Sequence, residues 1–406
     1  MRQAFRRIPL ATAAVGLGAL WLAWTMASLG FAAHFAPTRP DLALALAPDF
    51  PDAFVAQARA RMRGARPAVA AWLARRALAR DPLGGAALRT LGLALAATGR
   101  QGDADTVMDL AATRTWRDTL LGGWVFRRRL QQGRFGEAFD QADALLRRDV
   151  DPSLRDHLQN ALLIAATDGA MRGFLVAHLA PDPDWREPFI QRLVGEADPE
   201  AARSVLIALV TGSAPLKPGE FGPYLERRIA ERRFSDALAD WRVLTGAGHG
   251  PHVPPLDGDF LDDPDGTAFT WSKAEGAGAV SEIHPAPAAI GGRALRVDYD
   301  GRSSPTLPGE MLSVAPGRYR LTGLDLMQSG DDAGRMGWAV NCADGGPLAT
   351  RSGPPAILGG WRPFSVTFEA PDSACAAQWL RLMPGPGERP SPVVIWYARL
   401  RLERLG

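Results

Sequence analysis

Two hydrophobic patterns divide the chain. From about residue 49 to residue 248, apolar side chains recur at helical spacing and Ala, Leu and Arg dominate, which predicts amphipathic helices. Beyond about residue 257, short runs alternate apolar and polar residues between Gly, Pro and Asp, which predicts the many short strands of an all-β sandwich or barrel. The Gly- and Pro-rich stretch at roughly 245–255 predicts a linker between the two regions.

The helical region repeats itself. The glycine of a predicted turn, Gly99, returns 34 residues later at Gly133. The small residue Ala104 has counterparts at the same interval, at Ala70 and Ala138. Helix axes that approach to about 8–10 Å leave little room for large side chains, so small residues mark the positions where paired helices touch. The pattern predicts three consecutive helical hairpins in register.

This spacing resembles the tetratricopeptide repeat (TPR), in which stacked helical hairpins expose a groove. The resemblance implies that residues 49–248 bind protein partners. The candidate groove residues are Arg127, Arg128 and Arg129. A run of arginines also suits a solvated helix face. An irregular helical array is the alternative to true repeats, because residues 153–216 fall out of register before a last hairpin that places Ala237 and Trp241 in packing positions.

The N-terminus predicts a membrane anchor. Ile8–Ala33 is uncharged and follows three arginines. A helix needs about 20 apolar residues to span a bilayer, whereas the apolar part of a cleavable signal peptide is about 7–15 residues long. Residues 1–35 are therefore expected to form a cytoplasmic tip and a transmembrane signal-anchor, with cleavage near Ala32–Ala33 as the alternative. The positive-inside rule places the N-terminus in the cytoplasm and the body in a bacterial periplasm, at the inner membrane.

Two stretches of the C-terminal region carry the clearest strand pattern. In "WRPFSVTFEA" the residues expected on one buried face are Phe364, Val366, Phe368 and Ala370. In "VVIWYARLRLE" the residues expected on one face are Val394, Trp396, Ala398, Leu400 and Leu402. Such alternation is typical of half-buried antiparallel strands.

The order of "DGDFLDDPDGTAFTW", "LSVAPGRYRLTG", "WRPFSVTFEAP" and "VVIWYARLRL" resembles the galactose-binding-like jelly roll of many carbohydrate-binding modules, over residues 253–406. Tyr397 stands where that family often has an acidic residue in its last strand, so the family's binding geometry is not carried over. The expected fold class is multidomain: a transmembrane helix, an all-α TPR-like array and an all-β jelly-roll sandwich.

The chain has only two cysteines, Cys342 and Cys375, and both lie in the predicted sandwich. Secreted and periplasmic proteins live in an oxidising compartment, so a disulfide is expected between them. Two buried free thiols are the alternative.

Sugar rings are held by aromatic faces, with Arg, Asn and Asp side chains forming hydrogen bonds to the hydroxyl groups. The sandwich region is rich in tryptophan, and most of these rings are expected in the core. If Leu380 and Leu382 point inward, Trp379 and Arg381 point outward together. The candidate ligand residues are Trp379, Arg381, Asn341, Asp325 and Arg335.

Composition and motifs exclude several classes of protein. The chain has 406 residues and a formal net charge of +2 without a Lys/Arg-dense block, which argues against nucleic-acid binding. It carries no GxSxG, HExxH or Walker motif, so neither an enzyme nor a cofactor or metal site is expected. "DGDFLDDPD" suits strand caps or a Ca²⁺ loop.

These features together predict a non-enzymatic, anchored scaffold. Its helical array is expected to bind protein and its sandwich to bind glycan, in the assembly or export of exopolysaccharide or envelope polysaccharide. A scaffold for envelope protein assembly, whose sandwich docks protein rather than sugar, is the alternative.

Overall fold

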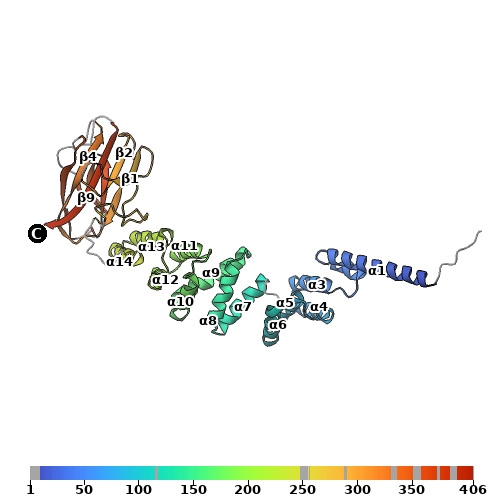
Figure 1. Cartoon of the computed structure of the whole chain (residues 1–406). Helices are drawn as coiled ribbons and strands as arrows, with labels where there is room; N and C mark the ends of the chain where they lie inside the picture. Colours follow the sequence, from blue (N-terminus) through green and yellow to red (C-terminus); the bar gives the residue numbers. More distant parts are fainter. Residues whose placement is uncertain are drawn as a thin grey trace, which may run out of the picture. The chain divides into compact units, whose positions relative to one another are not determined.

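The structure is a computed structural model that describes residues 10–114, 118–246, 255, 257–287, 290–330, 336–350, 358–372, 375–384 and 391–405. These residues form helices first and strands afterwards (Figure 1), and the chain divides into two compact units, Met1–Asn160 and Ala161–Gly406. The helices are α1 (Leu10–Phe35), α2 (Pro40–Leu46), α3 (Pro51–Arg63), α4 (Pro67–Arg80), α5 (Gly85–Ala97), α6 (Gln101–Arg114), α7 (Thr119–Gln131), α8 (Phe135–Leu146), α9 (Pro152–Thr167), α10 (Gly169–Leu179), α11 (Arg186–Glu196), α12 (Pro199–Thr211), α13 (Pro218–Ala230) and α14 (Phe234–Leu244). The strands are β1 (Ala279–Pro285), β2 (Arg293–Tyr299), β3 (Gly309–Leu312), β4 (Gly317–Ser329), β5 (Met336–Cys342), β6 (Pro347–Thr350), β7 (Arg362–Ala370), β8 (Gln378–Pro384) and β9 (Val393–Leu405). The predicted fold class is confirmed.

Helix α1 contains a segment, Val15–Phe35, of 21 residues with a mean hydropathy of 1.5. Its length and composition suffice to cross a membrane, and a signal sequence near the N-terminus meets the same criteria. The last turn of α1 packs against α2 and α3. The residues that form this contact are Ala32, Ala36, Ala43 and Ala53. The apolar helix is therefore packed directly onto the first helices of the array, while the arginines before it lie outside the described residues.

The predicted repeats are present as the hairpins α3–α4, α5–α6 and α7–α8. Ala65, Gly99 and Gly133 occupy the three turns with φ values of 54°, 79° and 70°. This left-handed conformation favours glycine at a helix end. A fully buried alanine follows each turn at the same spacing; these residues are Ala70, Ala104 and Ala138. The turns and the helix contacts both keep the 34-residue period that the sequence predicted.

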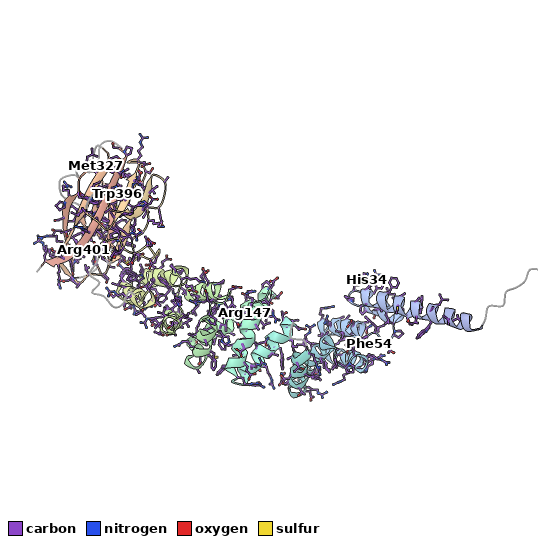
Figure 2. The ribbon with its side chains drawn as sticks, viewed as in Figure 1. His34, Phe54, Arg147, Met327, Trp396 and Arg401 are labelled. Carbon is purple, nitrogen blue, oxygen red and sulfur yellow. A yellow bond between two sulfur atoms is a disulfide. The ribbon has the colours of Figure 1, made fainter. Side chains whose placement is uncertain are left out.

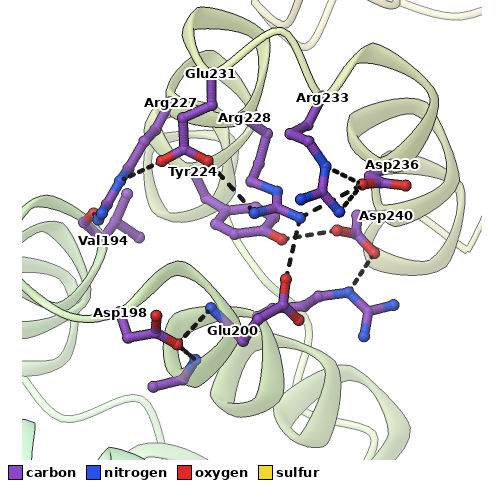
Figure 3. Close-up of polar contacts among 12 residues, drawn as sticks. Val194, Asp198, Glu200, Tyr224, Arg227, Arg228, Glu231, Arg233, Asp236 and Asp240 are labelled. Atoms are coloured by element: carbon purple, nitrogen blue, oxygen red, sulfur yellow. Dashed lines mark hydrogen bonds and ion pairs between the residues drawn. The ribbon is translucent and has the colours of Figure 1, made fainter.

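The later helices depart from that period but end in a further hairpin, α13–α14. Ala237 and Trp241 are buried in it, as predicted. A polar network lies under this hairpin (Figure 3). The hydroxyl of Tyr224 donates to Asp240 at 2.7 Å, and Arg203 donates to the same carboxylate at 2.8 Å. Burial and the bond to Asp240 raise the pKa of Tyr224 above its usual range, so the phenol stays protonated and keeps this donor role.

The strands form a sandwich of two antiparallel sheets. One sheet has five strands in the order β1-β2-β9-β4-β7, and the other has four in the order β3-β8-β5-β6. The core between them includes Trp338, whose ring centroid lies 5.1 Å from Tyr397 and 5.5 Å from Trp271. The inward residues predicted for β7 are buried there: Phe364, Val366, Phe368 and Ala370. Tyr397, predicted to stand where carbohydrate-binding modules often have an acidic residue, is fully buried.

The prediction of a single apolar face along β9 is wrong. The pairing of β4 with β9 shifts register between Thr322 and Leu324, and Arg399 in β9 has a φ of 53°. A β-bulge of this kind inserts an extra residue and turns the following side chains to the other face. Trp396 therefore lies on the outer face of the five-stranded sheet, whereas Leu400 and the residues after it alternate into the core.

The predicted disulfide is confirmed, because Cys342 and Cys375 are bonded with their Cα atoms 5.2 Å apart. Cys342 is the last residue of β5, and Cys375 precedes β8 by a short turn. Since β5 and β8 are neighbours in the four-stranded sheet, the disulfide closes the end of that strand pair. Most of the predicted linker, residues 247–254, lies outside the described residues.

Candidate ligand-binding site

The candidate site is the outer face of strand β8. Leu380 and Leu382 are fully buried in the core, so Trp379 and Arg381 point to the other side of the sheet, as the alternation predicted. Both are half-buried, and the guanidinium carbon of Arg381 lies 4.5 Å from the centroid of the Trp379 ring. This is the distance of a cation–π contact, which holds the guanidinium group in place on the ring.

Asn341 joins this pair from the neighbouring strand. In the register of β5 with β8, Asn341 is directly opposite Trp379, and paired residues of an antiparallel sheet point to the same face. Its side chain is half-exposed and makes no hydrogen bond with the described residues. Three of the five predicted ligand residues thus converge on one face and present an aromatic ring, a guanidinium group and an amide.

Small residues flank Arg381 on both sides. Gly309 of β3 and Ala339 of β5 are its cross-strand partners. A Cβ atom at Gly309 would lie 3.1 Å from both Cβ and Cγ of Arg381, a spacing too tight for ordinary packing, so glycine lets the arginine stem lie close to the sheet. Ala339 is only 2% exposed. Neither residue is predicted from the sequence, because the role of each depends on strand pairing.

Close packing leaves Arg381 partly desolvated. Its Nε atom is buried and has no hydrogen-bond partner. Within the described part of the chain no carboxylate forms an ion pair with it. Burial lowers the pKa of Arg381, but a guanidinium group stays charged at neutral pH. A charged group removed from water without a partner is unfavourable, so this face gains from an incoming acceptor.

The structure places the other two predicted ligand residues elsewhere. Asp325 is fully buried, and its carboxylate lies 3.4 Å from the guanidinium group of Arg362. Its cross-strand partner is the core residue Tyr397, so Asp325 faces the interior of the sandwich. Arg335 lies outside the described residues.

Carboxylates in the acidic stretch "DGDFLDDPD" have protein partners. Asp257 accepts hydrogen bonds from the backbone amides of Leu261 and Asp262, and burial raises its pKa. Asp265 accepts one from the indole of Trp241 on α14 at 3.0 Å. Two ion pairs also join this stretch to the strands; they are Asp259 with Arg401 and Asp263 with Arg293. These contacts fasten the stretch to its surroundings.

The three arginines proposed for a groove in the helical array do not converge. Arg128 forms an ion pair at 2.5 Å with the largely buried Asp105 of α6. Arg129 donates to the carbonyl of Glu137, at the start of α8, at 3.1 Å. Of the three, Arg127 alone is exposed. Successive residues of a helix point about 100° apart, and two of the arginines form contacts with neighbouring helices of the array.

The outer face of the five-stranded sheet is covered over part of its area. Trp396, labelled in Figure 2, is 8% exposed and packs with Leu326, Ala294 and Ala398. Its indole donates to Gln328 at 2.8 Å. The indole N–H of Trp396 thus has a protein partner, whereas that of Trp379 has no hydrogen-bond partner among the described residues.

No protein-family model and no curated protein matches this chain. Among solved structures, the CBM22-1 xylan-binding domain from Paenibacillus barcinonensis Xyn10C is 12% identical, with 34% of this chain and 88% of that chain covered at a TM-score of 0.28. A family 22 carbohydrate binding module of Clostridium thermocellum Xyn10B is 14% identical, with 38% and 98% covered at 0.27. PilF of Pseudomonas aeruginosa is 17% identical, with 56% and 90% covered at 0.28. At this level of similarity the ligand of this chain has to be argued from its own residues.

Proposed function

We propose that this chain is a non-enzymatic scaffold, anchored in the bacterial inner membrane with its bulk in the periplasm. In this proposal the helical array binds protein partners and the β-sandwich binds glycan, in the assembly or export of exopolysaccharide or envelope polysaccharide. The apolar helix α1 supports the anchor, since its length and hydropathy suit a membrane span. The disulfide between Cys342 and Cys375 supports an oxidising compartment.

The observation that carries the glycan assignment is the convergence of Trp379, Arg381 and Asn341 on one outer sheet face. An aromatic ring beside hydrogen-bonding groups suits a sugar, because a pyranose presents C–H groups on its faces and hydroxyl groups at its rim. The amide of Asn341 offers both a donor and an acceptor to such hydroxyl groups.

The glycan assignment is tested by affinity electrophoresis of the full chain in non-ionic detergent. The gels contain polysaccharide purified from the envelope of the source bacterium, or none. We expect the polysaccharide to retard the wild type and to retard the Trp379→Ala variant much less. The matched control is Trp72→Ala on α4, because Trp72 is an exposed tryptophan that also lies near an arginine, Arg76, at 5.2 Å.

Retardation lost with Trp379→Ala and kept with Trp72→Ala supports glycan binding at this face. Equal mobility of the wild type with and without polysaccharide contradicts it, and then favours a sandwich that docks protein. Circular dichroism of each variant confirms that its fold is unchanged.

The anchor is tested separately. A C-terminal fusion to alkaline phosphatase, which is active only in the periplasm, should be active and should stay in the membrane fraction after carbonate extraction. Inactive enzyme, or release into the soluble fraction, contradicts the proposed topology.

A further inference from the structure

Arg381 is the only charged residue at the described outward positions of β3, β5 and β8. The outward positions of β3, β5 and β8 follow from their register. These positions are Gly309, Met311, Gly337, Ala339, Asn341, Trp379, Arg381 and Met383. Arg381 is the one charged residue among them. A single guanidinium group among these described positions suits a ligand whose repeating unit carries one negative charge.

We infer that the glycan bound at this face is acidic, and that a carboxylate on its sugar rings is the partner of Arg381. The inference rests on the proposed function and names the class of its ligand: a polysaccharide that contains uronic acid or another carboxylated sugar. A sugar with one carboxylate per ring matches one arginine flanked by the amide of Asn341 and the ring of Trp379.

The geometry prepares Arg381 for this role. The ring of Trp379 fixes the guanidinium group at 4.5 Å, and Gly309 with Ala339 lets its stem lie low on the sheet. Little side-chain freedom then remains to be lost on binding. The planar guanidinium group forms paired hydrogen bonds with a carboxylate, and a carboxylate also compensates the desolvated charge. A neutral sugar offers the guanidinium group only hydroxyl oxygens, which form weaker hydrogen bonds than a carboxylate does.

Glycan is favoured over an acidic protein surface because of what surrounds the arginine. An acidic protein patch presents several carboxylates, and proteins that bind one present several cations. Here an amide and an aromatic ring accompany a single cation, which suits a ring that carries hydroxyl groups beside its carboxylate.

The test compares two polymers that differ only in the carboxylate. Polygalacturonate and its carboxyl-reduced form, in which each acid has become a primary alcohol, are titrated into the full chain by calorimetry, at about 0.15 M salt so that long-range attraction is screened. We expect the wild type to bind polygalacturonate about tenfold or more tightly than the reduced polymer, since hydrogen bonds to charged groups are the stronger class.

Variants locate the preference. Arg381→Gln should lower the affinity for polygalacturonate to that for the reduced polymer, and Arg381→Lys should restore part of the difference. Arg320→Gln is the matched control, because Arg320 is an exposed arginine on the other sheet, in β4, and its loss changes the net charge by the same amount. It should leave the preference intact.

The remaining outcomes separate this inference from the proposed function. Equal affinity for the two polymers overturns the inference that the ligand is acidic, but it leaves glycan binding in place. So does a chain that binds neutral xylan and does not bind polygalacturonate. Binding of none of the three overturns both. Binding of polyglutamate as tightly as polygalacturonate, and lost in Arg381→Gln, also overturns the inference and indicates an acidic protein partner.

Discussion

The two outer faces of the sandwich each carry a tryptophan, and the two rings meet different surroundings. Trp396 on β9 is 8% exposed, is covered in part by Trp361 and Ile290, and gives its indole proton to Gln328. Trp379 on β8 is half-buried and contacts a guanidinium group that has no carboxylate partner among the described residues. The Trp396 ring has its packing and hydrogen-bond partners within the protein. Beside the Trp379 ring, the Nε atom of Arg381 has no hydrogen-bond partner, so a ligand can supply one.

The two tryptophans differ in exposure because different segments of the chain cover the outer faces of the two sheets. The turn after β1 and the residue before β7 meet over the five-stranded sheet, where the indole of Trp361 donates to the carbonyl of Pro287 at 2.8 Å. On the four-stranded sheet, the small residues beside Arg381 let its side chain lie close to the sheet surface. The indole of Trp396 therefore has its hydrogen-bond partner within the protein, and the proposed ligand face is the one on which Trp379 and Arg381 lie.

The largest expected effect is that of Trp396→Ala. Removing a buried tryptophan destabilises a protein by about 3–5 kcal/mol, so protection against hydrogen exchange in β4 and β9 should fall by that amount. Hydrogen exchange of the full chain, read by mass spectrometry on peptides from these strands, measures it. Trp379→Ala is the comparison and should cost less, because part of the Trp379 side chain already meets water. Similar losses for both variants would contradict the contrast between the two faces.

The second effect concerns the disulfide, which lies at the end of β5 and β8 in the four-stranded sheet and does not involve the five-stranded sheet. Replacing Cys342 and Cys375 together with serine should destabilise β5 and β8 by about 2–4 kcal/mol, because the unfolded chain regains the freedom of a long loop. Hydrogen exchange of peptides from β5 and β8 measures this change. Reduction of the wild type with dithiothreitol should reproduce it. Unchanged protection after reduction would mean that the sheet does not depend on this bond.

Features that depend on local periodicity, such as helical hairpins and the two faces of a strand, are predictable from the sequence. The 34-residue interval between Gly99 and Gly133 located the helical hairpins, and the alternation around Leu380 and Leu382 placed Trp379 beside Arg381. Both patterns repeat within a single element, so they are visible without knowledge of the partners.

Pairing between distant segments was not predictable in the same way. Asp325 looked like a ligand residue near a strand end, but its cross-strand partners place it in the interior beside Arg362. The bulge at Arg399 moved Leu400 to the opposite face from Trp396. Gly309 is ordinary in the sequence and matters only because β3 lies against Arg381. Each of these depends on a neighbour far away along the chain.

A smaller effect is expected for Trp361→Phe. The substitution keeps an aromatic ring and removes the hydrogen bond to Pro287, a loss of about 1 kcal/mol. The cover over Trp396 should loosen. Hydroxyl-radical footprinting reads each tryptophan separately: Trp379 should be oxidised faster than Trp396 in the wild type, and Trp361→Phe should narrow that gap. A gap that stays the same would show that Trp361 does not protect Trp396.

The smallest effect on stability, about 0.5 kcal/mol, is expected for Trp379→Phe, because one half-buried aromatic ring is replaced by another. Binding should respond more than stability does. A cation–π contact at an exposed site contributes about 0.5–1 kcal/mol and is strongest with tryptophan. With phenylalanine Arg381 is held less firmly, so affinity for polygalacturonate should fall by at most about two- to fivefold. Calorimetry beside hydrogen exchange measures both quantities on one preparation. If affinity stays at the wild-type value while Trp379→Ala abolishes binding, the ring serves the sugar alone and does not position Arg381. If Trp379 positions Arg381 for a carboxylate, Trp379→Phe and Arg381→Lys should both lower the affinity for polygalacturonate. Neither should reduce the protection of β8 against hydrogen exchange.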